Sequence, residues 1–170
     1  MSTKKPRIDL DATDREMLRL LQEDAGLSNT ALGERLSLSV TPCWRRRKRL
    51  EDEGLIKDYQ ANLDRRMLGF DVLAFVHVRF DAHTDDAPDR FEQVIQTLPQ
   101  VLSCHKVTGD ADYVLQVLAT DLDAYGEFVE RVLRKQRGIA SIHSSLALRE
   151  VKSTSRIPVS DAPHKTARSI

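Results

Sequence analysis

The spacing of apolar residues along this chain changes near residue 70. Before that point, apolar side chains recur every three or four residues in three short runs, as on the buried face of a helix. After it, stretches that alternate between the two faces of a strand are separated by two further helical runs. The pattern therefore predicts three N-terminal helices followed by a mixed α and β region.

The first two helices have clear start signals. We expect the first to begin near Asp11 or Thr13, with Glu16 as the capping-box partner of Thr13, and to end at Gly26. Its buried stripe comprises Leu10, Met17, Leu18, Leu20 and Leu21. Ser28 is expected to cap the second, shorter helix. The buried face of that helix comprises Ala31, Leu32 and Leu36.

The third helix is predicted to run from Val40 to Glu53, after a tight connection. Ser39 or Thr41 can cap its N-terminus. Pro42 suits the first turn, because the missing N–H has no helical partner to lose there, and Gly54 ends the helix.

Five consecutive cations, Arg45 to Arg49, lie in this third helix. At about 100° per residue, with Cys43 directed inward, Arg47 and Leu50 fall on the core side and Arg46 at its edge. The outward side comprises Thr41, Arg45, Lys48, Arg49 and Asp52. A basic run of this length surrounds the helix, so it is not simply one solvated face.

Three short helices with a tight turn before the last are typical of a helix-turn-helix, whose final helix enters the major groove of DNA. This context favours DNA binding over the alternative of a solvated surface helix. We expect Arg45 or Arg49 to contact base edges and Lys48 to contact phosphate of double-stranded DNA. The candidate DNA-contact residues are Ser39, Thr41, Arg45, Arg46, Lys48 and Arg49.

The chain after the third helix is predicted to change from one domain to another. Residues 55–61 alternate in character and are predicted as a strand, forming a wing or crossing to a partner. These residues close a helix-turn-helix domain over 1–61, and 62–69 form a linker. Residues 153–170 are polar, contain two prolines and are expected to be a loose C-terminal tail.

Residues 70–152 are predicted to form a βαββαβ domain. The predicted strands cover 70–80, 101–107, 113–119 and 139–151, and helices start within 84–89 and 120–123. This order gives an antiparallel sheet with both helices on one face, a ferredoxin-like fold of the α+β class. The second helix is expected to bury Leu122, Tyr125, Val129, Val132 and Leu133. The other sheet face is also rich in Leu, Phe and Val, so we expect another copy of the chain to cover it.

Composition limits the remaining function classes. The net charge is zero, but the basic residues concentrate at 45–49, so one helix can still bind DNA. No apolar run approaches the roughly 18 residues of a membrane span, and no secretory signal is present, which predicts a cytoplasmic, nucleoid-associated protein without membrane contact. Cys43 and Cys104 lie far apart, and His77, His105 and His143 lack metal-ligand spacing, so neither a disulfide nor a metal site is expected.

Several longer motifs resemble the leucine-responsive regulator/AsnC family, also called feast/famine regulators. They are Leu-Asp-Ala-Thr-Asp-Arg-Glu-Met-Leu at 10–18, Thr-Pro-Cys-Trp-Arg-Arg at 41–46, Arg-Leu-Glu-Asp-Glu-Gly-Leu-Ile at 49–56, Gly-Asp-Ala-Asp-Tyr at 109–113 and Ser-Ser-Leu-Ala-Leu at 144–148. The resemblance covers about residues 9 to 158. It implies a transcription regulator that forms dimers assembling into tetramers or octamers. It also implies that a small amino acid binds between βαββαβ modules, with no other cofactor.

Carried onto this sequence, the resemblance implies that Thr41, Arg45 and Arg49 lie in or beside the major groove. It implies an effector site near the loop at 109–113, where turn N–H groups can hold a carboxylate and Asp110 or Asp112 an ammonium group; the alternative is an ordinary hairpin turn. The candidate effector residues are Thr108, Gly109, Asp110, Asp112, Tyr113, Ser144 and Ser145. Branched-chain amino acids, other small amino acids and cysteine all stay open as effectors. Arg47 departs from the family, which usually has an aliphatic core residue there.

Three functions from different classes follow. The leading hypothesis is a sequence-specific, amino-acid-responsive transcription regulator. The alternative is an architectural nucleoid-type protein with weak sequence preference. An enzyme is disfavoured, because the sequence contains no nucleophile elbow, no Gly-x-Gly-x-x-Gly loop and no metal cluster.

Overall fold

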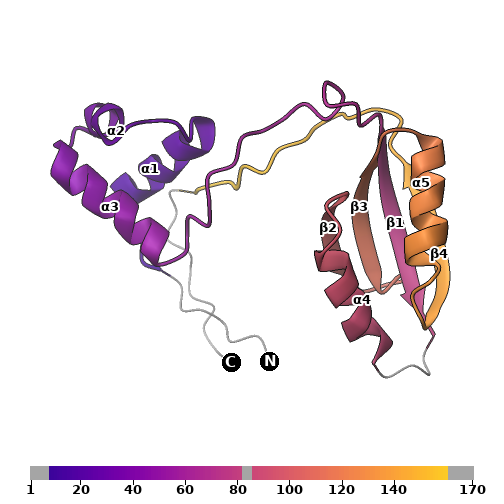
Figure 1. Ribbon diagram of the computed structural model, residues 1–170. Helices are drawn as coiled ribbons and strands as arrows, with labels where there is room; N and C mark the ends of the chain where they lie inside the picture. Colours follow the sequence, from indigo (N-terminus) through magenta and orange to yellow (C-terminus); the bar gives the residue numbers. More distant parts are fainter. Residues whose placement is uncertain (1–7, 82–85, 161–170) are drawn as a thin grey trace. The chain divides into compact units, whose positions relative to one another are not determined.

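The computed structural model describes residues 8–81 and 86–160 (Figure 1). The chain divides into two compact units. One is Leu63–Ser153, and the other combines the residues up to Asn62 with those from Thr154 onward. Among the residues described, no helix is long and apolar enough to cross a membrane.

The N-terminal unit contains the three predicted helices, α1 (Ala12–Glu23), α2 (Asn29–Leu36) and α3 (Val40–Asp52). Their apolar stripes meet in one core formed by Met17, Leu21, Leu27, Leu32, Cys43 and Leu50. Complete burial of a side chain such as Leu32 or Leu50 stabilises the fold by about 1.5–3 kcal/mol. The apolar residues whose spacing predicts each helix are therefore also the residues that pack the three helices together.

The turn between α2 and α3 is too tight for a side chain at Gly33. Leu38 N donates to Gly33 O at 2.8 Å, and a Cβ on Gly33 would lie 2.7 Å from Leu38 O. Ser37 adopts the left-handed conformation that ends α2, with φ of 54°. The close approach holds the start of α3 against α2.

The capping box of α1 differs from the prediction. Asp11 is the N-cap: its carboxylate accepts from Asp14 N at 2.7 Å, and Asp14 Oδ2 accepts from Asp11 N at 3.2 Å. The predicted pairing of Thr13 with Glu16 is wrong, because Asp11 and Asp14 form the same reciprocal arrangement two residues earlier. Ser28 caps α2 as predicted, accepting from Ala31 N.

The strand predicted over 55–61 is absent from the described chain. After Gly54, with φ of +73°, the N–H groups of Leu55 and Ile56 both donate to Leu50 O and close the end of α3. Tyr59 is then held by side chains of α3. These contacts leave the segment as irregular chain without a paired strand.

The C-terminal unit has the predicted βαββαβ order. Its elements are β1 (Val72–Phe80), α4 (Ala87–Gln96), β2 (Val101–Lys106), β3 (Tyr113–Ala119), α5 (Leu122–Phe128) with a π-helical turn at Val129–Leu133, and β4 (Ile139–Leu146). All strand pairs are antiparallel, and the order β2-β3-β1-β4 runs from left to right in Figure 1. Residues 84 and 85 of the predicted helix start lie outside the described residues.

Both helices pack on one face of this sheet, as predicted. Their buried side chains, including Phe91, Tyr125 and Phe128, share one core with alternate residues of β1 and β3. Leu122, predicted to be buried, is 60% exposed, because the buried residues of α5 begin only at Tyr125. Strand β4 ends at Leu146 instead of Val151, and Val151 is exposed.

Part of the predicted loose tail is bound to α1. Arg19 donates to Val159 O through Nε at 3.3 Å and through Nη2 at 2.9 Å. Gln22 and Ile157 exchange two further hydrogen bonds, at 3.0 and 2.6 Å. Residues 154–160 therefore complete the N-terminal unit, and residues 161–170 lie outside the described part of the chain.

Residues 62–69, predicted as a linker, mostly belong to the C-terminal unit, which starts at Leu63. Arg65 Nη1 donates to the carbonyl oxygens of Phe70 and Asp71, and Phe70 N donates to Arg65 O. These bonds close a turn at the entrance to β1.

Candidate DNA-binding face and ligand groove

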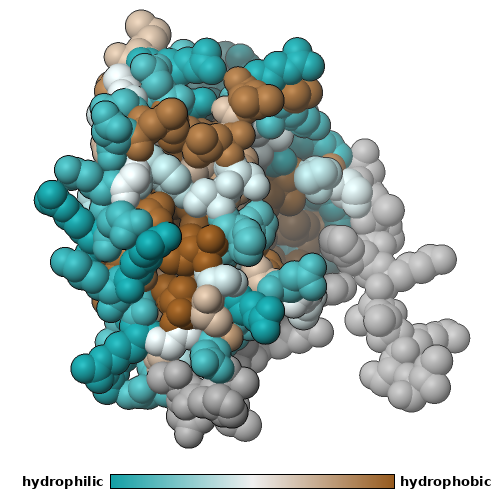
Figure 2. All heavy atoms as spheres, turned by 90° about the vertical axis from the view of Figure 1, so that its right-hand side faces the viewer, coloured by the Kyte–Doolittle hydropathy of each residue, from teal (hydrophilic) through white to brown (hydrophobic). Residues whose placement is uncertain are grey.

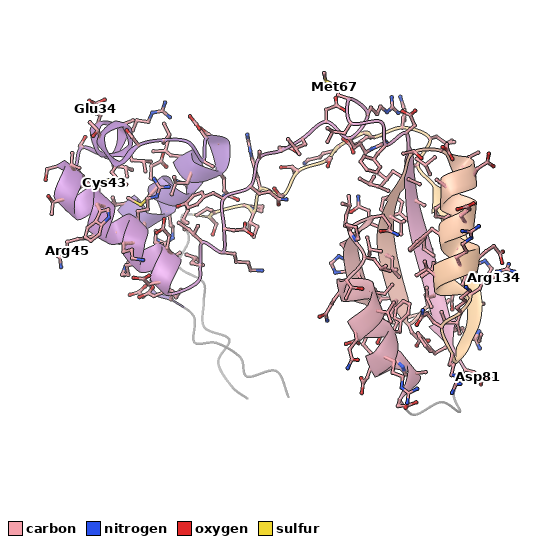
Figure 3. All side chains as sticks on the ribbon, in the orientation of Figure 1. Glu34, Cys43, Arg45, Met67, Asp81 and Arg134 are labelled. Carbon is pink, nitrogen blue, oxygen red and sulfur yellow. The ribbon has the colours of Figure 1, made fainter. Side chains whose placement is uncertain are left out.

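Helix α3 directs two cations outward from the N-terminal unit. Figure 3 shows Arg45 projecting away from the other helices, whereas Cys43 points between them. The exposed Arg45 and Lys48 line a shallow hollow together with Trp44, Arg49, Asp52 and Glu53. Thr41 is also exposed, and Ser39, the N-cap, makes no capping bond with its side chain.

The two outward cations differ in their partners. Lys48 Nζ lies 2.8 Å from Asp52 Oδ1, and this hydrogen bond raises the pKa of Lys48. Both side chains are exposed, so the pair contributes little to stability. Arg45 has no ion-pair partner within the described chain.

Arg46 and Arg49 reach back to α1 through their guanidinium groups, although the Arg49 side chain is still 41% exposed. Arg46 Nη1 lies 2.8 Å from Asp14 Oδ1 and 2.5 Å from Asp11 Oδ2, and Arg49 Nη2 lies 2.5 Å from Asp14 Oδ2. The helical projection put Arg46 at the edge of the core side and Arg49 on the outward side. The structure instead brings both guanidinium groups to one carboxylate.

Arg47 lies on the core side of α3, as the projection predicted. Its side chain donates to Leu27 O at 3.0 Å and to Glu51 Oε1 at 3.1 Å. Its guanidinium also donates to the hydroxyl of Tyr59 at 3.0 Å. The stem of Arg47 fills a position next to the core while its head ties α3 to flanking segments.

The C-terminal unit has a groove at one end of the sheet face that the helices leave open. The groove encloses about 620 Å³ and is lined by His77, Arg79, Val107, Thr108, Asp110, Ala111, Val114, Ser141 and His143. The register explains this set, since His77 pairs with His143 and Arg79 with Ser141 across β1 and β4. The loop between β2 and β3 closes the end of the groove.

The structure brings two predicted effector residues, Thr108 and Asp110, into this groove. Gly109 lies between them with φ of +118°, a conformation that favours glycine. Ser145 pairs with Phe75 on β1, outside the groove.

Three other predicted effector residues have structural partners. Asp112 Oδ2 accepts from Phe80 N at 2.7 Å. Tyr113 is buried and donates its hydroxyl to Glu92 Oε1 at 2.6 Å, and burial raises its pKa. Ser144 faces the helices, because its Oγ accepts from the hydroxyl of Tyr125 at 2.5 Å.

Sequence reasoning missed the strand residues of the groove, His77, Arg79, Ser141 and His143. A usable pattern existed, because His77 and Arg79 recur at a spacing of two in the first strand, opposite the face that carries Val76 and Val78. What the sequence lacks is the register that sets them beside β4. The groove combines one fixed cation, Arg79, with one carboxylate, Asp110, and two hydroxyl groups, which suits a small zwitterion.

Apolar side chains are exposed as well on the C-terminal unit. Figure 2 shows apolar patches between polar side chains on the side that carries α5 and β4 in Figure 1. Phe75 on the open sheet face is 39% exposed. Within the described ranges, no three His, Cys, Asp or Glu side chains come together as metal ligands.

Two family models match the chain. The Lrp/AsnC ligand binding domain matches residues 73–157, and a winged helix-turn-helix DNA-binding model matches residues 10–57. The chain is similar to the Bkd operon transcriptional regulator of Pseudomonas aeruginosa, with 42% identity over 89% of this chain and 99% of that protein. It is also similar to the DNA-binding transcriptional activator DecR of Escherichia coli K12, with 37% identity over 88% of this chain and 99% of that one.

The fold is also similar to solved structures. A transcriptional regulator from Neisseria meningitidis, solved in complex with L-Met, has a TM-score of 0.85 and 39% identity, covering 88% of this chain and 97% of that one. The matches span both units, including the helix-turn-helix and the unit that contains the groove. This chain therefore belongs to the Lrp/AsnC family of transcriptional regulators, which are DNA-binding proteins and not enzymes.

Proposed function

We propose that this protein is a sequence-specific regulator that contacts double-stranded DNA through the outward face of α3 and responds to a small amino acid bound in the C-terminal unit. The observation that carries the DNA-binding part is the exposed pair Arg45 and Lys48 on the last helix of a helix-turn-helix. Arg45, which has no ion-pair partner among the described residues, can bond bidentately to guanine, and Lys48 can exchange Asp52 for a phosphate. Ser39 and Thr41, at the start of α3, supply hydroxyl groups to the same face.

The groove is the proposed effector site. Arg79 holds the α-carboxylate and Asp110 holds the ammonium group, with Thr108 and Ser141 as hydroxyl partners. Asp112 is excluded from this role because its carboxylate already accepts from Phe80 N. The Neisseria meningitidis relative was solved with L-Met, which supports an amino-acid ligand for the equivalent unit of this chain.

A second copy of the chain covers the open sheet face in this proposal. Phe75 and the neighbouring apolar side chains of that face have no cover within the described chain. Pairing of two such faces would bring the grooves between copies, and further association gives the expected tetramers or octamers. The protein acts in the cytoplasm, bound to the nucleoid.

A thermal-shift screen with the twenty amino acids tests the effector site. A true effector at 100 times its Kd raises stability by about 2.7 kcal/mol. Arg79→Gln should abolish the shift for that amino acid. Arg137→Gln is the matched control, because Arg137 is exposed and does not line the groove. Equal shifts in both variants would remove Arg79 from the site.

The architectural alternative makes a different prediction. An organiser of weak sequence preference binds random duplexes nearly as tightly as any selected one. Enrichment of binding sites from a random library, followed by the ratio of specific to non-specific affinity at fixed salt, separates the two. A ratio near one contradicts the sequence-specific proposal.

A further inference from the structure

One acidic residue of α1 holds the basic run of α3. Asp14 is 1% exposed and is the only charged residue that is buried in the described chain. Its Oδ1 accepts from Arg46 at 2.8 Å, and its Oδ2 accepts from Arg49 at 2.5 Å and from Asp11 N at 3.2 Å. A buried carboxylate needs such partners, because an unpaired charge without water is strongly destabilising.

The ion pairs that Asp14 forms differ in burial from the ion pair of Lys48 with Asp52 on α3. The Asp14 carboxylate is buried although the Arg49 side chain is 41% exposed. Removing a donor to Asp14 therefore weakens the compensation of a buried charge, whereas the exposed pair Lys48–Asp52 separates at little cost. Lys48 can therefore leave its carboxylate for a phosphate. Arg49 cannot do so without leaving Asp14 with a weaker set of donors.

The arginines also hold α3 on both of its flanks. Arg46 and Arg49 are three residues apart and both reach α1. Arg47, on the other flank, donates to Leu27 O before α2. Bonds on two flanks oppose rotation of α3 about its own axis, so they determine which side chains face outward.

We propose that Asp14 is a positioning residue for DNA recognition, which holds α3 through Arg46 and Arg49, keeps Arg49 off the duplex and leaves Arg45 and Lys48 to contact it. This inference rests on the proposed DNA-binding role of α3. It assigns three of the five cations, Arg46, Arg47 and Arg49, to orientation of the helix. It gives α1 a part in sequence preference through its contacts with α3.

The test compares Asp14→Asn and Arg49→Gln in the full chain. Binding to a random duplex is measured against salt, where each phosphate contact adds about 0.9 to the slope. Arg49→Gln should leave that slope unchanged, because Arg49 does not contact phosphate in the parent protein. Asp14→Asn should steepen it by about 0.9, because Arg49 is released. With a duplex selected by the parent protein, both variants should lower the specificity ratio about tenfold, the size of one lost base contact.

Glu16→Gln is the matched control. It removes the same charge from α1, but Glu16 is exposed and pairs with Arg19, so slope and ratio should stay at parental values. Circular dichroism checks that each variant is folded, since a simple loss of fold lowers both affinities together and leaves the ratio unchanged. If Asp14→Asn does not fold, Arg49→Gln decides alone, because Arg46 still pairs with Asp14.

Two results would overturn the proposal. One is a slope for Arg49→Gln that is flatter by about 0.9, which means that Arg49 contacts phosphate. The other is an unchanged specificity ratio in the folded variants. Failure to enrich any site with the parent protein contradicts the proposed sequence-specific function instead, and the slopes on random duplex still decide the role of Arg49.

Discussion

The guanidinium of Arg47 lies 4.8 Å from the centre of the Tyr59 ring, over its face. The Tyr59 hydroxyl also donates to Glu51 Oε1 at 2.8 Å, so the three side chains form one cluster. Arg47 and Glu51 belong to α3, whereas Tyr59 lies five residues beyond Gly54. The helix proposed to contact DNA thus holds the segment that leads away from it.

Replacement of Arg47 by leucine should be tolerated. Leucine covers the core-side position but loses the contacts with Tyr59 and Leu27 O, so the free energy of unfolding should fall by about 1–2 kcal/mol. Affinity for a random duplex should change little, because Arg47 does not face outward, whereas sequence preference should fall, because Arg47 is one of the residues that orient α3. Denaturant unfolding and binding to random and selected duplexes measure these effects. Loss of binding to the random duplex in a folded Arg47→Leu variant would show that our assignment of the outward face is wrong.

Replacing Arg45 and replacing Lys48 should impair DNA binding in different ways. Arg45→Ala should relax the preference at one base pair, with a discrimination loss of about 1–3 kcal/mol. Lys48→Ala should weaken binding to all duplexes alike and reduce the salt slope by about 0.9. Titrations against single-base variants of a selected site, at several salt concentrations, distinguish these outcomes. Equal behaviour of the two variants would contradict the separate roles.

A methyl group at Gly33 should destabilise the N-terminal unit. Its Cβ would meet Leu38 O at 2.7 Å, and the backbone must move, at a cost of about 1–3 kcal/mol. Trp44, the one tryptophan of the chain, reports unfolding of this unit by its fluorescence. Gly126→Ala is the control, because its Cβ would have open space in α5 of the other unit, and it should leave the Trp44 transition unchanged. A Gly33→Ala variant as stable as the parent would mean that the turn is looser than described.

The capping carboxylate of α1 should make the N-terminal unit acid-sensitive. The hydrogen bond from Asp14 N, and then Arg46, hold the pKa of Asp11 below its ordinary value of 3.8. The stabilisation is therefore complete above 3.8 and is lost as the pH falls through the lower pKa of the folded state. Asp11→Asn keeps a cap but has no charge to titrate, so its disadvantage relative to the parent should shrink below that pH. Trp44 fluorescence during urea unfolding measures it, and a gap independent of pH contradicts the assignment.

Local sequence patterns predicted the elements well. Periodicity together with start and stop signals gave α2, α3 and β3 within a residue or two, and Ser28 and Gly54 act at the predicted ends. These features depend on neighbours three or four residues away, which the sequence displays directly.

Contacts between distant residues were not predictable in the same way. The pairing of Arg49 with Asp14 joins residues 35 positions apart, and a projection of α3 alone cannot include a partner on α1. The groove likewise depends on the register of β1 against β4, which brings Arg79 opposite Ser141. Ser144 was assigned to the effector site without knowledge of this register. One step along β4 directs a side chain to the opposite face, and Ser144 faces the helices.

The bonds from Arg19 and Gln22 to the segment at 157–159 have a consequence for biosynthesis. The chain emerges from the ribosome N-terminus first. Ile157 and Val159, which bond to α1, are therefore translated only after the whole ligand-binding unit. A product shortened before residue 157 would carry every helix of the helix-turn-helix and yet lack these contacts. The DNA-binding unit can thus gain its last contacts only after the ligand-binding unit has been synthesised in full.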